Sequence, residues 1–194
     1  AVLRLLGLFD RPASASLLTA LRASPVIADL TEPLQGISQE QWNITLSELE
    51  ECGLVEPLSA STASDAGAVD AHPLLREYFA TQLKTQLTAA WRAGHQRLFE
   101  HLCTTTEEGQ QPTLSDLQPL YQAVAHGCLA GMHQEALYKV YIDRILRGTG
   151  ESDGFYATKK LGAFGSDLAA VACFFERPWT AVSPRLSEAD QAWL

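Results

Sequence analysis

The sequence predicts a mainly α-helical chain that contains one small β-hairpin. Apolar residues recur at helical spacing along most of the chain, and Gly and Pro separate these stretches from one another. Only two short runs, close to each other, have the character of strands. The 194 residues are 46% hydrophobic, which is enough for one or two packed cores.

The first helices are short and end at clear breaks. The run "AVLRLLGLF" predicts one helix that ends near "DRP", and we expect the chain to be a segment of a longer protein because it enters this run directly. "SASLLTALRAS" predicts a second helix. Residues 25–35 are expected to form a short helix or turn that ends at Gly36. One face of the second helix carries Leu17, Leu18 and Leu21.

The clearest helix is "SQEQWNITLSELEECG". Ser38 is its expected N-cap, Gln41 completes a capping box, and Gly53 follows its end. The spacing i, i+4, i+7 predicts that one face is buried. That face consists of Trp42, Leu46 and Leu49.

A hairpin and a further helix follow. "LVEPL" (54–58) and "AVDAH" (68–72) are predicted strands, and the Ser/Ala/Gly-rich stretch between them a loose tip. Pro73 suits the first turn of the helix "PLLREYFATQL" and keeps His72 on the extended side of the junction. The imidazole should then lie near a helix N-terminus, which favours an anion. Three helices followed by a hairpin are the order of a winged helix, and "PLLREYFATQL" would be a helix that leaves the wing, so a winged-helix domain is expected over 1–83.

The rest of the chain is expected to be helical. Residues 84–112 form a connecting helix and a polar linker, and 113–147 form two helices that turn at Gly131. After a Gly-rich stretch (148–166), "SDLAAVACFFE" predicts a helix, "RPWTAVSP" a linker and "SEADQAWL" the start of another helix. The buried stripe of the first helix in the pair consists of Leu114, Leu117, Tyr121, Val124 and Cys128.

Charge argues against nucleic acid as a partner. The net charge is −9, and residues 1–83 hold four basic and eleven acidic residues, with no Lys or Arg between Arg22 and Arg76. Affinity for DNA depends on basic side chains that neutralise phosphates. The Trp42 helix, which would enter the major groove in a DNA-binding winged helix, is itself acidic.

No pattern predicts catalysis, so we expect the segment not to be an enzyme, with no catalytic residues and no metal ligands. The five histidines lack metal-ligand spacing, and "GAFGSD" (162–167) lacks the pattern of a phosphate-binding loop and fits a turn between helices. The acidic pairs Glu50–Glu51 and Glu107–Glu108 fit solvated surface. Most of the four cysteines fall on apolar helix faces and fit buried positions, and the expected compartment is a reducing cytoplasm. No run reaches the roughly 20 apolar residues of a membrane span, so no membrane partner is expected.

The motif "AHPLLREYF", placed between an acidic winged helix and helical hairpins, resembles the regulatory half of STAND-type signalling ATPases. This group includes bacterial NB-ARC proteins, plant disease-resistance proteins and the apoptotic protease-activating factor. Their winged helix ends in a Met-His-Asp motif that opens a helix of "LLRDY" character, and its histidine contacts the β-phosphate of ADP. Here Ala71, His72 and Pro73 take the three places, so the histidine matches while Ala and Pro replace Met and Asp.

The helices after 113 are similar to tetratricopeptide (TPR) hairpins. In "AHGCLAGMHQEAL", Gly131 lies at the turn and Ala136 at the close-packing position, while Val124 departs from the small residue preferred there. The expectation for 113–194 is therefore a TPR-like helical region.

The resemblance implies a regulatory switch. A nucleotide-binding domain upstream in the parent protein would hold ADP or ATP, and the segment itself would hold no cofactor. His72 would contact the ADP phosphate, and the helical repeats would receive a protein trigger or effector. Two alternatives remain open on the sequence: a cytoplasmic protein-interaction adaptor that never senses nucleotide, and a winged-helix transcription regulator.

Overall fold

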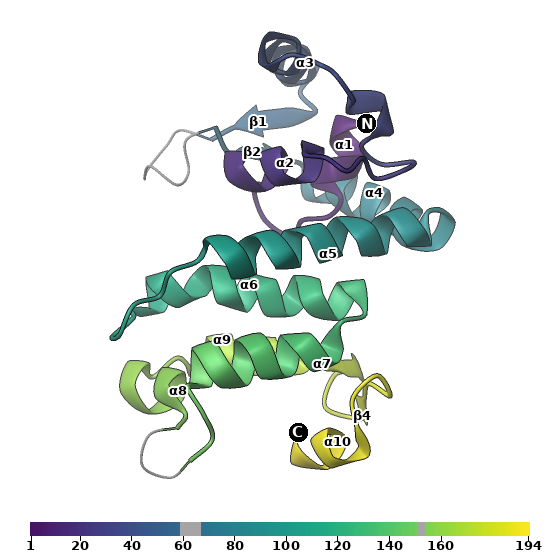
Figure 1. The fold of residues 1–194 in the computed structure, drawn as a ribbon. Helices are drawn as coiled ribbons and strands as arrows, with labels where there is room; N and C mark the ends of the chain where they lie inside the picture. Colours follow the sequence, from purple (N-terminus) through teal and green to yellow (C-terminus); the bar gives the residue numbers. More distant parts are fainter. Residues whose placement is uncertain (59–66, 151–153) are drawn as a thin grey trace. The chain divides into compact units, whose positions relative to one another are not determined.

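The computed structural model describes residues 1–58, 67–150 and 154–194 (Figure 1). It is mainly helical with a small two-stranded antiparallel hairpin, which confirms the predicted fold class, and the described residues also contain a second short antiparallel pair. The chain divides into two compact units, Ala1–Arg97 and Leu98–Leu194. The division falls within the segment expected to connect the two regions (84–112), and the predicted hairpin tip lies largely outside the described residues.

The first unit follows the predicted order of elements. Ser38 and Gln41 form the expected capping box, with the Gln41 amide 3.2 Å from Ser38 Oγ and the Ser38 amide 2.9 Å from Gln41 Oε1. The elements are α1 (Val2–Leu6), α2 (Ala15–Arg22), the 3₁₀ helix η1 (Glu32–Leu34), α3 (Gln39–Glu51), β1 (Val55–Pro57), β2 (Val69–Ala71), α4 (Pro73–Gln86) and α5 (Thr88–Thr105), the last of which continues past the division.

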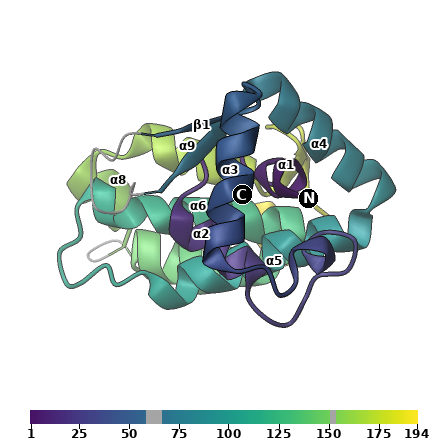
Figure 2. The ribbon, with the colours of Figure 1, turned by 90° about the horizontal axis from the view of Figure 1, so that it is seen from above.

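Helices α1 and α4 approach each other closely at a glycine (Figure 2). A Cβ atom added to Gly7 would lie 2.8 Å from the backbone nitrogen of Ala80 and 2.9 Å from the carbonyl carbon of Phe79. Leu5 and Leu6 of α1 are almost fully buried next to this point. The position of α4, whose first residue follows His72, thus depends on a residue without a side chain.

Helix α3 is less buried than its sequence predicts. Of the expected face only Trp42 is buried, at 4% exposure, whereas Leu46 and Leu49 are half-buried. A hollow of about 170 Å³ between α3 and the hairpin, lined by Leu46 and Val55 among others, leaves Leu46 partly uncovered. The Arg22 guanidinium covers the Trp42 ring at 4.1 Å and fastens α3 to α2.

The second unit is built on a helical hairpin. Gly131 ends the first helix in the left-handed region (φ 89°), and the Met132 amide donates to the Gly127 carbonyl at 2.8 Å, as expected for a glycine C-cap. Of the predicted stripe, only Leu114 is exposed. The elements are α6 (Leu114–Ala130), α7 (His133–Glu135), the helix η3 (Ala136–Leu146), α8 (Tyr156–Leu161), α9 (Phe164–Ala172), β3 (Phe175–Arg177), β4 (Ala181–Val182) and α10 (Glu188–Trp193).

Two predicted boundaries in this unit are wrong. The helix expected over 166–176 begins earlier, at Phe164, and ends at Ala172. The expected linker "RPWTAVSP" instead contributes to an antiparallel pair, β3 with β4, which turns at Trp179 (φ 63°). Phe174, which follows the end of the helix, is fully buried, and its ring lies 6.1 Å from the Tyr141 ring.

Two expectations about individual side chains also need correction. Only Cys128 among the four cysteines is buried, whereas Cys52 is exposed at the end of α3 and the other two are half-buried. Glu108 is not solvated surface: its carboxylate lies 2.5 Å from the Arg144 guanidinium, which lowers its pKa. Local sequence could not show this pairing, because the partner lies 36 residues away.

Candidate functional site

His72 is the N-cap of α4. Its backbone is extended (φ −50°, ψ 134°), as predicted from Pro73, and its carbonyl accepts from the Leu75 amide at 2.8 Å. The imidazole Nδ1 accepts from the Leu74 amide at 3.3 Å. The side chain therefore supplies the cap itself, and the Leu74 amide is not open to an anion in this structure.

This cap determines which edge of the ring can donate. Because Nδ1 accepts a hydrogen bond, the neutral ring carries its proton on Nε2. His72 is exposed, so this N–H can reach a group outside the unit. A histidine whose Nδ1 is occupied in this way presents Nε2–H, which suits a donor to a phosphate oxygen.

The β1–β2 hairpin and an ion pair hold the junction between β2 and α4 in place. β1 and β2 pair in antiparallel register, with Val55 opposite Ala71, and the Ala13 and Val69 backbones exchange two hydrogen bonds of 2.9 Å. The Asp70 carboxylate accepts from the Ala71 amide at 2.8 Å and from Arg76 Nη1 at 2.6 Å. Arg76, in the first turns of α4, thereby ties the helix back to β2.

A hollow of about 210 Å³ lies beside the ring, between the end of α3 and the start of α4. Its charged lining residues are Glu56 and Asp70, and the nearby Arg76 is already paired with Asp70. The hollow alone is too acidic to hold a polyphosphate. Further positive charge would have to come from a partner surface.

A second polar cluster lies in the core of the other unit. Asp167, 7% exposed, accepts from Tyr121 Oη at 2.7 Å and from Thr158 Oγ1 at 2.8 Å. Burial and this contact raise the pKa of Tyr121, which keeps its hydroxyl protonated as a donor. The three residues come from α6, α8 and α9. They form a satisfied buried network that joins these helices, without a base–nucleophile pair.

The described parts of the chain contain no group of three or more His, Cys, Asp or Glu side chains arranged for a metal ion. His95 is fully buried edge-on against Trp91, with ring centroids 4.1 Å apart, and His126 is also buried. Burial lowers the pKa of His101 and of His133. No helix in the described ranges has both the length and the apolar character to cross a bilayer.

No family model, curated protein or solved structure matches this chain. Its function is therefore inferred from the residues of the site. The structure brings His72 together with Asp70, Arg76 and Glu56, and of these only the histidine is predicted from the sequence as a site residue. The Asp70–Arg76 pair spans a strand and a helix, so no helical or strand spacing indicates it.

The Asp167 network yields a prediction about stability. In the full chain, Asp167→Ala leaves the Tyr121 and Thr158 hydroxyls without their buried acceptor, so the free energy of unfolding should fall by about 2–3 kcal/mol. Thermal unfolding measures this loss, and Asp143→Ala, on the exposed side of η3, is the matched control. Tyr121→Phe should cost little more in the Asp167→Ala background. Equal melting of the two alanine variants would contradict the network.

Proposed function

We propose that the chain is the regulatory segment of a STAND-type signalling ATPase. In this proposal residues 1–83 are a winged-helix domain that packs in cis on an upstream nucleotide-binding domain. Residues 113–194 are TPR-like helices that bind a cytoplasmic protein trigger or effector. ADP or ATP binds the upstream domain, and His72 touches its phosphate.

The observation that carries the proposal is the state of His72. The motif "AHPLLREYF" places this histidine at a strand-to-helix junction, and the Leu74 amide occupies Nδ1. The exposed Nε2–H can then donate to a phosphate oxygen without breaking the cap. Loss of that contact would favour the open form, because a ligand shifts a conformational equilibrium only through contacts that differ between the two forms.

The acidic lining of the hollow fits a divided site. Glu56 and Asp70 oppose phosphate, so this unit contributes one N–H donor, while positive charge and Mg²⁺ belong to the nucleotide domain. Helix α3 carries four exposed acidic residues, Glu40, Glu48, Glu50 and Glu51. This surface disfavours the transcription-regulator alternative, because it would repel DNA phosphates.

The adaptor alternative has one observation in its favour. Large apolar side chains of the second unit are exposed, including Phe164 at 62% and Leu168 at 56% on α9. A protein-binding surface of this kind needs no nucleotide. The coding sequence upstream of Ala1 separates the two functions: a GxxxxGK[ST] loop supports the ATPase, and its absence there contradicts it.

The proposal also predicts the behaviour of the chain in isolation. The 194-residue chain should release no phosphate from ATP above the buffer rate, because one histidine cannot replace a phosphate loop and Mg²⁺ ligands. Steady-state phosphate release measures this directly. Turnover that a point substitution within the chain abolishes would show that the chain carries its own catalytic site.

A further inference from the structure

The helix η3 has an unusual hydrogen-bond pattern. Its 11 residues form i→i+5 bonds, and at its end the Arg147 amide donates to the Ile142 carbonyl. Such π-helices are rare and are found mostly as single turns within α-helices. A run of this length needs side-chain contacts that offset its less favourable backbone.

The buried side chains supply one part of these contacts. They form three pairs separated by four and then five residues: Ala136 with Leu137, Val140 with Tyr141, and Ile145 with Leu146. This spacing fits a wide helical turn. An α-helix would instead align Arg144 with Val140 (i+4) and Tyr141 (i+3) on the buried face. It would also turn Leu146 outward, since nine residues after Leu137 is two and a half α-helical turns.

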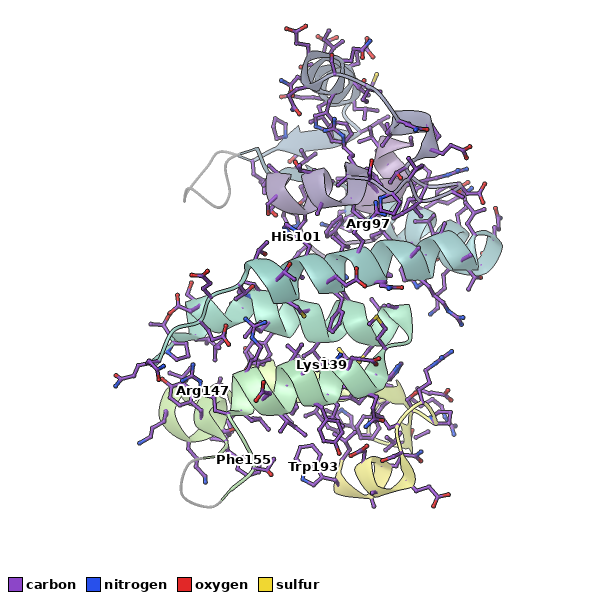
Figure 3. The ribbon with its side chains drawn as sticks, viewed as in Figure 1. Arg97, His101, Lys139, Arg147, Phe155 and Trp193 are labelled. Carbon is purple, nitrogen blue, oxygen red and sulfur yellow. The ribbon has the colours of Figure 1, made fainter. Side chains whose placement is uncertain are left out.

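The Arg144 guanidinium supplies the other part. It donates to both Glu108 oxygens, at 2.8 and 2.5 Å, and to the carbonyls of Cys103 and Thr106, at 2.7 and 2.6 Å. These carbonyls lie at and just after the end of α5, where helix carbonyls lack partners within the helix. Arg147, which follows η3 (Figure 3), also donates to the carbonyls of Gly109 and Gln110.

We propose that η3 is a two-state helix and that Arg144 decides between its states. With its guanidinium on Glu108 and the end of α5, the i→i+5 register is stable. When these partners withdraw, the long side chain can reach toward solvent, and the segment relaxes to an α-helix that turns Leu146 outward. A trigger that moves the end of α5 would thus expose an apolar residue of the second unit. The inference does not depend on nucleotide sensing.

Thiol modification of the full chain tests the switch. Leu146→Cys should be protected, because the residue is 1% exposed. Adding Arg144→Leu removes the guanidinium contacts and lets an apolar side chain occupy the buried face of an α-helix. Modification at position 146, located by mass spectrometry, should then accelerate about tenfold or more, the factor that corresponds to losing a charge-assisted contact. Adding Glu108→Gln instead should give a smaller acceleration.

Two controls separate a register change from loosening of the structure. Leu137→Cys should stay protected in every background, because residue 137 faces the core in both registers. Lys139, labelled in Figure 3, is exposed on η3. Lys139→Leu, an equally apolar change, should therefore leave position 146 protected. Equal acceleration at 137 and 146, or none at 146, would overturn the proposal. If circular dichroism shows that the Arg144→Leu variant does not fold, the Glu108→Gln variant alone tests the proposal. Unchanged protection of Cys at position 146 in that variant would overturn the proposal.

Discussion

Gly7→Ala is expected to lower the free energy of unfolding of the first unit by about 2–3 kcal/mol. The added Cβ would lie 2.8 Å from the Ala80 nitrogen and 2.9 Å from the Phe79 carbonyl carbon. Both are backbone atoms of α4, which cannot move aside as the end of a side chain can. The backbone of Gly7 is ordinary (φ −64°), so alanine brings no dihedral strain and the loss has a steric origin only.

Thermal unfolding of the full chain measures this effect. A loss of 2–3 kcal/mol should lower the melting temperature of a unit of this size by about 8–24 °C. Gly165→Ala is the matched control: nothing lies within 4 Å of its added Cβ, and alanine favours α9 by about 0.5–1 kcal/mol. Opposite shifts for the two variants support the close approach of α1 and α4. A Gly7→Ala variant whose melting temperature equals or exceeds that of the wild type would contradict this close approach.

Substitutions at His72 should change nucleotide affinity and the stability of the fold independently of each other. Asn is a better N-cap than His, so His72→Asn should keep or raise the melting temperature, whereas His72→Ala should lower stability by no more than about 1 kcal/mol. Both remove the Nε2–H donor. A charge-assisted contact to phosphate is worth roughly 1.5–3 kcal/mol, so both should weaken ADP binding in the parent protein by about tenfold or more.

Local signals predicted much of the fold. Three local features could be predicted because each depends on residues close together in the sequence. They are the capping box of Ser38 with Gln41, the helix end at Gly131 and the helix start at Pro73. The exposed place of His72 could be predicted for the same reason. Two contacts could not be predicted from the sequence: the hydrogen bond from the Leu74 amide to His72 Nδ1, and the nearby Asp70–Arg76 ion pair.

Tertiary packing decided the remainder. The sequence predicts a helix here but not the π-helical register of η3, because the Arg144 contacts come from the end of α5 and the residues after it, 36 to 41 residues away in the chain. The hairpin of β3 and β4 is not predicted because "RPWTAVSP" has the composition of a linker, and the burial of Phe174 against Tyr141 involves a residue distant in the sequence. Leu46 was predicted as core because periodicity indicates a face without showing what covers it.

The most direct test measures ADP on the parent protein that the proposal requires, purified as wild type and as His72→Asn. The two proteins should melt alike, because asparagine retains the cap. Wild type should retain bound ADP, while His72→Asn should bind it about tenfold or more weakly and shift toward the open form. Equal ADP affinity with an intact fold would show that His72 only caps α4, and would contradict the proposed contact.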